Sequence, residues 1–208
     1  QVAQLTVDMP SFITTTDSFE LGWSGWTASD ATIWEIGVPS SGPGAAHSGS
    51  NCFATVLSGN YPDDRTARLV SPAFLVPPAD QLPRLRFWQW WNIAGHDFVQ
   101  LQIKVGTNSW QPLGDQITLD GHSRWARAWH DLTLFAGQSV QIGFYFESHG
   151  YSYYCGGGNY CWALDPGLGW YIDDITIETG PFSPVTFPEN FENGWGDWRV
   201  DFIGGQMT

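Results

Sequence analysis

The strongest constraint on the fold is an alternation of apolar and polar residues that recurs along the chain, where helical periodicity is hard to find. The segment 98–105 reads Phe-Val-Gln-Leu-Gln-Ile-Lys-Val, which puts aliphatic side chains on one face of a strand and Gln100, Gln102 and Lys104 on the other. Similar runs occupy 51–57, 85–91, 139–147 and 170–178.

The connections between these runs complete the predicted fold. Residues 92–97 are expected to form a turn, so that 85–91 and 98–105 make a hairpin or neighbouring strands. One short helical turn is expected at 131–136, ended by Gly137. Short strands separated by Gly and Pro predict an all-β fold, a two-sheet antiparallel jelly-roll β-sandwich.

The surface composition indicates an extracellular protein. Only 14% of residues are charged, while 16% are aromatic and 24 of 208 are Gly. The net charge of −13 and the isoelectric point near 4.4 disfavour nucleic acid and anionic membrane surfaces, which need basic faces. No segment approaches the roughly 20 apolar residues of a membrane span. The start of the chain lacks the features of a signal peptide, so a secreted protein would have lost its targeting segment.

Three cysteines cannot all pair with one another. Cys155 and Cys161 flank a Gly-rich stretch that we expect to be a flexible loop, and we interpret them as a local disulfide; the alternative is two reduced thiols. Cys52, within a strand-like run, is expected to be a small buried hydrophobic residue. The spacing does not fit a zinc site.

An internal repeat divides the chain. The motif Phe-Glu-x-Gly-Trp-x-x-Trp occurs at 19–26 and again at 191–198, 172 positions later. Such a repeat indicates modular units. We therefore expect a leading strand or linker at 1–18 that resembles the end of a preceding unit, one whole domain at 19–179, a linker at 180–190, and the opening of a second, incomplete unit at 191–208.

Several short segments together resemble a known family. They are Phe-Glu-x-Gly at 19–22, Trp-Glu-Ile-Gly at 34–37, His-Ser-Gly-Ser at 47–50 and Trp-Tyr-Ile-Asp-Asp-Ile at 170–175. In these the chain resembles the MAM-like jelly-roll modules, also called choice-of-anchor J or immune inhibitor A C-terminal-type domains. The resemblance covers about residues 17 to 179 and implies an accessory module of secreted proteases or surface proteins. The chain departs from the family at 149–162.

The resemblance also implies a calcium ion. In related modules a structural calcium commonly lies between a first-strand Glu and a last-strand Asp, here Glu20 and Asp173, with the loop from His47 to Ser50 contributing oxygens. Because consecutive strand residues face opposite sides, only one of Asp173 and Asp174 is expected to face the ion, and we favour Asp173. The alternative is that Glu20 and Asp173 are solvated edge charges or accept hydrogen bonds from loop amides.

Aromatic residues are the other candidates for binding. Alternation places Phe87, Gln89 and Trp91 on one face and Trp88 and Trp90 on the other. One set must face the core; the second is either an open platform for sugar rings or is covered by neighbouring loops. The segment 149–162, expected to be a loop, adds further candidate contacts: Tyr151, Tyr153, Tyr154, Tyr160 and Trp162.

No catalytic motif is recognisable in the sequence, so we predict a non-enzyme. The first hypothesis is a secreted or cell-surface module that links a tandem array, an adhesive assembly or a filament, with other copies or an adjoining domain as partners. In that hypothesis residues 189–208 pack against a neighbouring copy or adjoining domain, for which the strand-like segment 2–7 is the natural complement. The alternatives are a polysaccharide-binding accessory module of a secreted enzyme, and a hydrolase with an unrecognised site.

Overall fold

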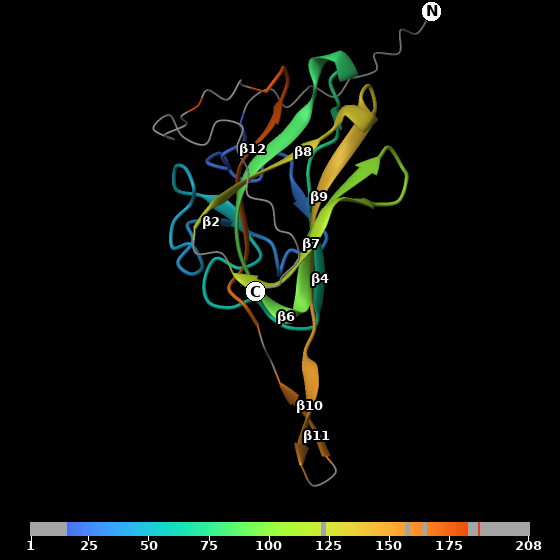
Figure 1. Ribbon diagram of the computed structural model, residues 1–208. Coiled ribbons are helices and arrows are strands. Elements are labelled where there is room, and N and C mark those ends of the chain that lie inside the picture. Colours follow the sequence, from blue (N-terminus) through green and yellow to red (C-terminus); the bar gives the residue numbers. More distant parts are fainter. Residues whose placement is uncertain (1–15, 122–123, 157–158, 164–165, 183–186, 188–208) are drawn as a thin grey trace, which may run out of the picture.

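The computed structural model describes residues 16–121, 124–156, 159–163, 166–182 and Phe187, and within them nearly all regular structure is β-strand (Figure 1). The strands are β1 (Thr27–Ala28), β2 (Glu35–Gly37), β3 (Cys52–Ala54), β4 (Arg65–Val70), β5 (Phe74–Leu75), β6 (Arg84–Val105), β7 (Gln111–Gly121), β8 (Ala126–Asp131), β9 (Ser139–Ser148), β10 (Tyr151–Gly156), β11 (Asn159–Ala163) and β12 (Gly169–Glu178). A 3₁₀ turn at Thr133–Phe135 confirms the expected helical turn, and another lies at Ala79–Gln81.

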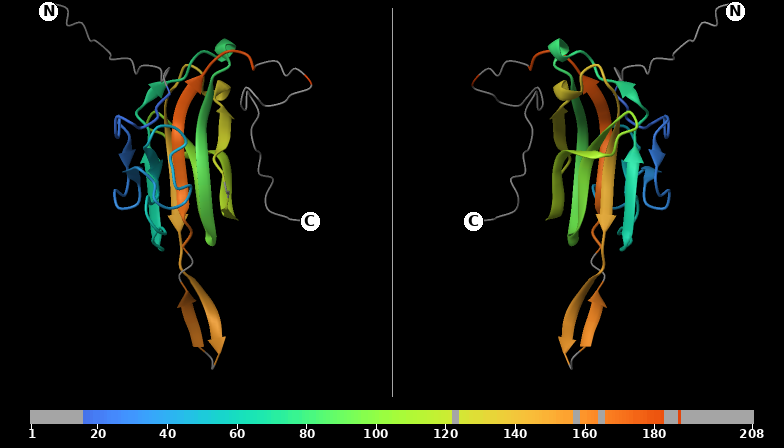
Figure 2. Two further views of the ribbon diagram at one scale, coloured as in Figure 1. Left: turned by 90° about the vertical axis from the view of Figure 1, so that its left-hand side faces the viewer. Right: turned by 90° about the vertical axis from the view of Figure 1, so that its right-hand side faces the viewer.

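The strands form an antiparallel jelly-roll β-sandwich, as predicted (Figure 2). One layer has the order β8–β6–β12–β3–β2, and the other has the order β1–β4–β9–β6–β7, with β5 also paired to β9. Because β6 belongs to both layers, ten strands share one continuous hydrogen-bond network that curls around the core.

The strand β6 corrects the expectation of a turn at 92–97. It is a single strand of 22 residues, whose first part pairs with β8 and β12 and whose last part pairs with β9. The pairing with β7 is irregular between Ile93 and Phe98. A bend of this kind lets one strand pass from one layer of a sandwich to the other, so the polar residues here mark a corner instead of a reversal.

Buried polar contacts hold this corner. Tyr61 Oη donates to Asp97 Oδ2 at 2.5 Å and accepts the N–H of Ala94 at 2.9 Å. Asp97 Oδ1 accepts the N–H of His149 at 2.7 Å. Burial, followed by the hydrogen bond to Asp97, raises the pKa of Tyr61, which therefore stays a donor at neutral pH.

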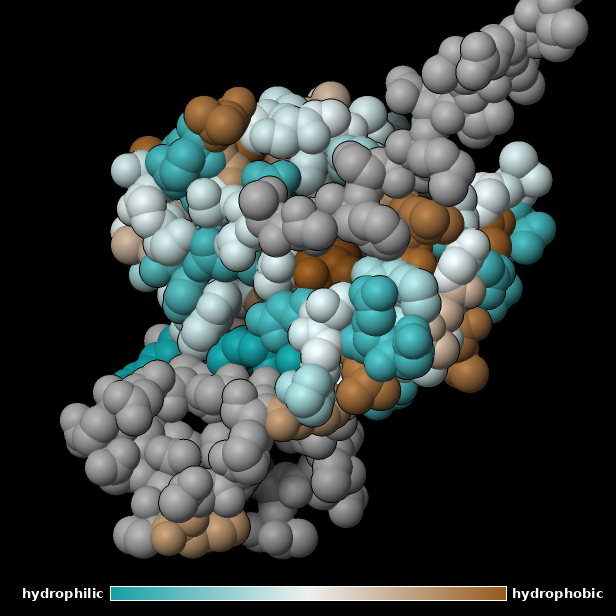
Figure 3. All heavy atoms as spheres, turned by 90° about the horizontal axis from the view of Figure 1, so that it is seen from above, coloured by the Kyte–Doolittle hydropathy of each residue, from teal (hydrophilic) through white to brown (hydrophobic). Residues whose placement is uncertain are grey.

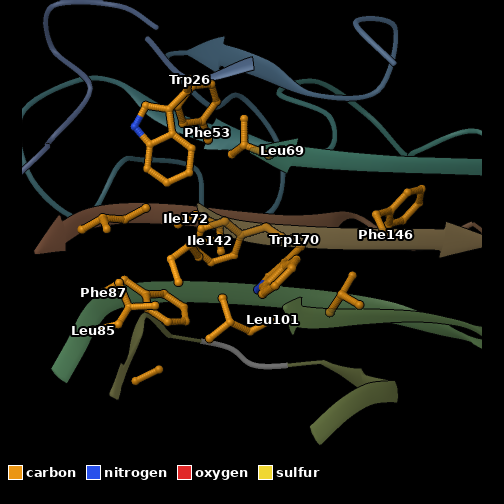
Figure 4. Packing of buried hydrophobic residues seen from close by; sticks show 14 of the residues in the cluster. Trp26, Phe53, Leu69, Leu85, Phe87, Leu101, Ile142, Phe146, Trp170 and Ile172 are labelled. Carbon is orange, nitrogen blue, oxygen red and sulfur yellow. The ribbon is translucent and has the colours of Figure 1, made fainter. Parts of the chain in front are cut away.

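The core lies between the two layers and is rich in aromatic rings (Figure 4). Phe144 of β9 packs against Phe87 of β6 and Trp170 of β12, in both pairs with ring centroids 5.2 Å apart. The inward faces predicted for 98–105 and 139–147 are confirmed, because Leu101, Ile103 and the four large apolar residues of β9 are buried. Cys52 is also buried and free, as expected.

Residues 151–156 and 159–163 correct the expectation of a loop. Their backbone forms the antiparallel hairpin β10–β11, which projects from one end of the sandwich (Figures 1 and 2). In its register Tyr153 lies opposite Cys161. The side chains of this hairpin lie outside the described part, and so do the predicted Cys155–Cys161 disulfide and the candidates Tyr151, Tyr153, Tyr154 and Trp162. The segments 1–15 and 188–208 are likewise outside it.

The first described residues join the last strand, as expected for a jelly roll. Asp17 and Ile175 form an antiparallel bridge with backbone hydrogen bonds of 2.8 and 3.0 Å. The end of the sandwich opposite the hairpin shows hydrophobic residues dispersed among polar ones over its described surface (Figure 3). Dispersed apolar residues are ordinary for a protein surface.

Candidate functional site

A pocket of about 340 Å³ lies on the outer face of the layer that contains β8, β6 and β12. We call it the Trp88 pocket. Its lining residues are Thr16, Arg86, Trp88, Arg127, Asp174, Thr176 and Glu178. Its volume falls within the range of small-ligand sites, which combine apolar surface with a few placed polar groups.

Strand alternation explains why these residues share one face. Phe87, Ala128 and Ile177 point into the core, so their neighbours along each strand point outward. Arg127 lies opposite Trp88 in the pairing of β8 with β6. The Trp88 pocket is therefore a direct result of the strand register.

A β-bulge in β12 corrects the expectation that Asp173 and Asp174 face opposite sides of the strand. The pairing with β6 shifts between Asp173 and Thr176, and Asp174 has a φ of +49°, a left-handed conformation that Asp tolerates better than most residues. Both carboxylates consequently reach the loop at His47 and Ser48, although in a regular strand only one could.

Asp173 is fully buried and binds backbone amides. Its Oδ2 accepts the N–H of His47 at 2.9 Å and of Ser48 at 3.1 Å, and its Oδ1 accepts the N–H of Asp174 at 2.8 Å. Burial raises the pKa of Asp173 to about 7, although the hydrogen bond from Ser48 opposes this shift. The carboxyl group therefore titrates near neutral pH.

Asp174 holds the side chains of the same loop. Its Oδ2 contacts His47 Nδ1 at 2.5 Å, and its Oδ1 accepts the hydroxyl of Ser48 at 2.7 Å. Burial alone would raise the pKa of Asp174, but hydrogen bonds from His47 and Ser48 and the charge of His47 outweigh it, so the pKa is lowered. Asp174 is thus an anionic anchor.

Glu20 completes the anchoring of the loop. Its Oε1 accepts the N–H groups of Ser50 at 2.8 Å and Asn51 at 2.7 Å, and these bonds lower the pKa of Glu20. Gly49 has a φ of +59°, and a Cβ there would lie 2.6 Å from Glu20 Oε1. The Gly in this motif is therefore required for the close approach of Glu20.

The predicted calcium ligands meet at this loop as an amide-binding cluster. The backbone N–H groups of His47 and Ser50 bind carboxylates, as in the alternative of loop amides that bind Glu20 and Asp173. The role of His47 and Ser50 as oxygen ligands of calcium stays a prediction. Within the described ranges, no group of three or more His, Cys, Asp or Glu side chains is arranged to hold a metal ion. Carboxylates are nevertheless the ligand type that calcium takes, so calcium stays a prediction.

The two candidate tryptophans differ in their surroundings. Trp90 is 6% exposed and packs edge-on against Tyr171, with ring centroids 5.3 Å apart, so it belongs to a small second core and is not a binding platform. Trp88 is half-buried. The ring of His47 stacks on the indole of Trp88, with ring centroids 3.8 Å apart. The loop that carries His47 therefore covers one face of the indole, and Trp88 still lines the pocket.

Three arginines, which the sequence analysis did not single out, surround Glu178. Arg86 Nη1 lies 2.9 Å from Oε2, Arg84 Nη2 lies 3.3 Å from Oε2, and Arg127 Nη2 lies 3.9 Å from Oε1. The one sequence signal for these arginines is that each occupies a polar position in a segment of alternating apolar and polar residues, which predicts an outward-facing side chain. Three guanidinium groups thus lie around one carboxylate on a chain with only 8 basic residues.

The sequence of this chain is similar to part of one curated protein. No family model matches the chain. Bacillopeptidase F of Bacillus subtilis (strain 168) is 32% identical over 168 residues, which cover 76% of this chain and 10% of the relative. The chain therefore spans about a tenth of the length of the curated relative it matches. The MAM-like assignment stays a prediction.

Solved structures with the same fold include adhesin domains. The K1 cleaved adhesin domain of Lys-gingipain from Porphyromonas gingivalis W83 has a TM-score of 0.53 and 18% identity, covering 80% of this chain and 98% of that chain. The K3 domain has a TM-score of 0.51 and 18% identity, covering 79% and 98%. TmCBM61, solved with beta-1,4-galactotriose, has a TM-score of 0.49 and 17% identity, covering 78% and 94%. The described part of the chain has no helix long and apolar enough to cross a membrane.

Proposed function

We propose that this chain is a non-catalytic, extracellular accessory module that binds a polysaccharide through the Trp88 pocket and so places a larger protein on its target. The observation that carries the proposal is the content of the pocket: one indole, two guanidinium groups, two carboxylates and two threonine hydroxyls around about 340 Å³. A sugar offers apolar C–H faces for an aromatic ring and hydroxyls for charged and polar partners.

The relatives support the accessory role. The similarity to Bacillopeptidase F covers about a tenth of that protein, which is the size relation expected of one module in a longer chain. The adhesin domains of Lys-gingipain share the fold. An accessory module on a secreted protein would work outside the cell, where low surface charge and many aromatic residues are common features of binding surfaces.

A glycan array tests the proposal. Wild-type protein should bind at least one class of immobilised glycan, and Trp88→Ala should lose that binding while it keeps the melting temperature within a few degrees. Binding that Trp88→Ala leaves unchanged would contradict the assignment of the pocket. An array with no bound glycan would contradict the polysaccharide proposal as a whole.

A link in a tandem array or filament is a second candidate, favoured by the repeated motif. In its first copy the motif has structural duties: Phe19 and Trp26 pack against Phe53 of β3, and Glu20 binds the amides of the 50–51 loop. We infer that the second copy at 191–198 needs an equivalent strand and loop, from a longer chain or another molecule. Self-association that disappears on removal of residues 188–208 would favour this function; a monomer with or without them would count against it.

A further inference from the structure

We infer that the hairpin β10–β11 joins two copies of this chain: β11 of one copy pairs with β11 of the other, and the two hairpins make one four-stranded antiparallel sheet. In the part of the chain that the structure describes, the two strands of the hairpin pair with each other alone, as a sheet separate from the sandwich. A two-stranded ribbon is marginally stable in water, and an independent sheet needs three or more strands. A second hairpin supplies the missing strands, and this contact is independent of the Trp88 pocket.

The hairpin lacks the features that keep exposed strand edges from pairing. Natural edge strands are short or carry charged residues and proline, because an open row of N–H and C=O groups pairs readily with another strand. The segment 150–163 contains no charged residue and no proline. Its four Tyr and one Trp are residue types that favour strands. Its edges are therefore open to another strand.

The edge strands of the sandwich, in contrast, are guarded. The longest of them, β7, contains Pro112 and two aspartates, and β8 contains Arg127 and Asp131. The strand β2 has three residues, with Glu35 among them, and β1 and β5 have two residues each. Among the strand edges that the structure describes, those of the hairpin are thus the ones that a further strand can join.

The register of the hairpin selects β11 as the pairing strand. Tyr154 lies opposite Tyr160, and two residues further along β10 the partner is Asn159. The strand β10 therefore carries one extra residue, and a bulge of this kind bends and twists a strand so that its outer edge pairs poorly. The strand β11 has no extra residue. Two copies of β11 related by a twofold axis run antiparallel, which gives the strand order β10–β11–β11–β10 and a closed dimer.

Hydrogen bonds at its base hold the hairpin in the projecting position that Figures 1 and 2 show. On the side of β10, the N–H of Gly150 donates to Asp64 Oδ1 at 3.1 Å. On the side of β11, Asn60 Nδ2 donates to the carbonyl of Pro166 at 2.8 Å. A fixed direction reduces the conformational entropy that is lost when two hairpins pair.

The distribution of charge also favours contact between copies at this place. The chain has a net charge of −13, and all of its Lys, Arg, Asp and Glu residues lie outside 150–163. Two sandwiches of like charge repel each other. The six residues of β10 span about 20 Å at roughly 3.3 Å per residue, so paired hairpins keep the sandwiches about two Debye lengths apart at physiological ionic strength.

Sedimentation equilibrium of the full chain tests the contact, with reducing agent present so that no disulfide links the copies. The wild type should show a reversible monomer–dimer equilibrium. Added salt should strengthen the dimer, because ions screen the repulsion between the sandwiches. Tyr160→Lys puts like charges on the paired strands and should weaken the dimer at least tenfold. Gln116→Lys makes the same change of net charge on the exposed, guarded edge of β7 and should leave the dimer unchanged.

A mixture of two variants separates loss of the contact from loss of the hairpin itself. Tyr160→Lys and Tyr160→Glu should each be mainly monomeric. Their mixture should dimerise more tightly than either variant alone, because opposite charges then meet across the new strand pair. A mixture that associates as weakly as its components would contradict pairing through β11.

Four further results would overturn pairing through the hairpin. They are a wild type that stays monomeric at every concentration and salt, a dimer that reducing agent dissociates, a dimer that Tyr160→Lys leaves intact, and a dimer lost on removal of residues 188–208, which would assign the contact to that segment. A monomeric wild type whose glycan binding is lost in Tyr160→Lys would overturn it in favour of a polysaccharide as the occupant.

Discussion

The imidazole of His47 lies nearly parallel to the indole of Trp88, with ring centroids 3.8 Å apart and 15° between the ring planes. The same imidazole contacts Asp174 at 2.5 Å. One side chain therefore joins the 47–51 loop to β6 and to β12, and it fixes the orientation of the indole in the pocket. The amide-binding cluster and the Trp88 pocket therefore meet at His47.

Replacement of His47 by Ala should lower the free energy of unfolding by about 1 to 3 kcal/mol, because the part-buried Asp174 loses a hydrogen-bond partner. Urea unfolding measures the change. His149→Ala is the matched control: its ring also binds a carboxylate, Glu147 at 2.8 Å, but its side chain is 50% exposed, and exposed pairs contribute little. Equal effects of the two substitutions would contradict the role of His47.

Asp173 should make the protein less stable as the pH rises through neutrality. The pKa of Asp173 is about 7 in the folded protein, against a usual value of 3.8. Between about pH 4 and 7 the folded state therefore binds the additional proton, and the free energy of unfolding falls as pH increases. In urea unfolding with a chelator present, wild type should lose stability relative to Asp173→Asn between pH 5 and 8.

The control for this pH effect is Asp80→Asn, which changes an exposed carboxylate and should run parallel to wild type. A wild-type profile that runs parallel to Asp173→Asn would show that Asp173 does not titrate in this window. Asp174, Glu20 and His47 also face this region, and the lowered pKa values of Asp174 and Glu20 place their own contributions at lower pH.

Calcium, if it binds at Glu20 and Asp173, should raise the melting temperature. A ligand at a hundredfold its dissociation constant adds about 2.7 kcal/mol to the folded state, which corresponds to several degrees for a domain of this size. Scanning calorimetry with chelator and with millimolar calcium measures the shift. Glu20→Gln and Asp173→Asn should each abolish it and Glu147→Gln should not; a melting temperature indifferent to calcium would refute the site.

Tyr61→Phe should destabilise the corner of β6 by about 1.5 to 3 kcal/mol, since it removes a hydrogen bond to the buried, charged Asp97. Tyr171→Phe is a close comparison, because Tyr171 is equally buried but its hydroxyl contacts the neutral Ser41 Oγ at 2.9 Å. That change should have a smaller effect, about 0.5 to 1.5 kcal/mol. Unfolding free energies that rank the two variants in the opposite order would contradict this account of the corner.

Alternation predicted the fold well because burial on one face imposes a period of two on a strand. It predicted the inward residues of β9 and placed Phe87 and Trp91 opposite Trp88. It failed at 92–97 and at Asp173–Asp174 for one physical reason: bends and bulges interrupt the period, and a polar, Gly-containing stretch can be a bend within a strand as well as a turn. Tyr61, whose hydroxyl holds this corner, lies between β3 and β4 and far from 92–97 in the sequence. Its hydrogen bonds therefore leave no pattern in the sequence of the corner itself.

The candidate site was predictable only in part. Glu20, His47 and Asp173 were identified as a group because the family resemblance placed them together, whereas their amide contacts depend on the left-handed Gly49 and on the bulge at Asp174. Arg86, Arg127 and Glu178 come from three strands, and only the strand register brings them to one pocket. A single sequence does not encode that register in any local pattern.

The central claim, that the Trp88 pocket is the polysaccharide site, is tested most directly by comparing two tryptophan variants. Trp110 is also half-buried but lies against Arg68 and Lys104 of the other layer, so Trp110→Ala removes an indole of similar exposure from a different face. Affinities for a polymer that the wild type binds should fall at least tenfold in Trp88→Ala and stay near the wild-type value in Trp110→Ala. A loss confined to Trp110→Ala, or equal losses in both folded variants, would contradict the account.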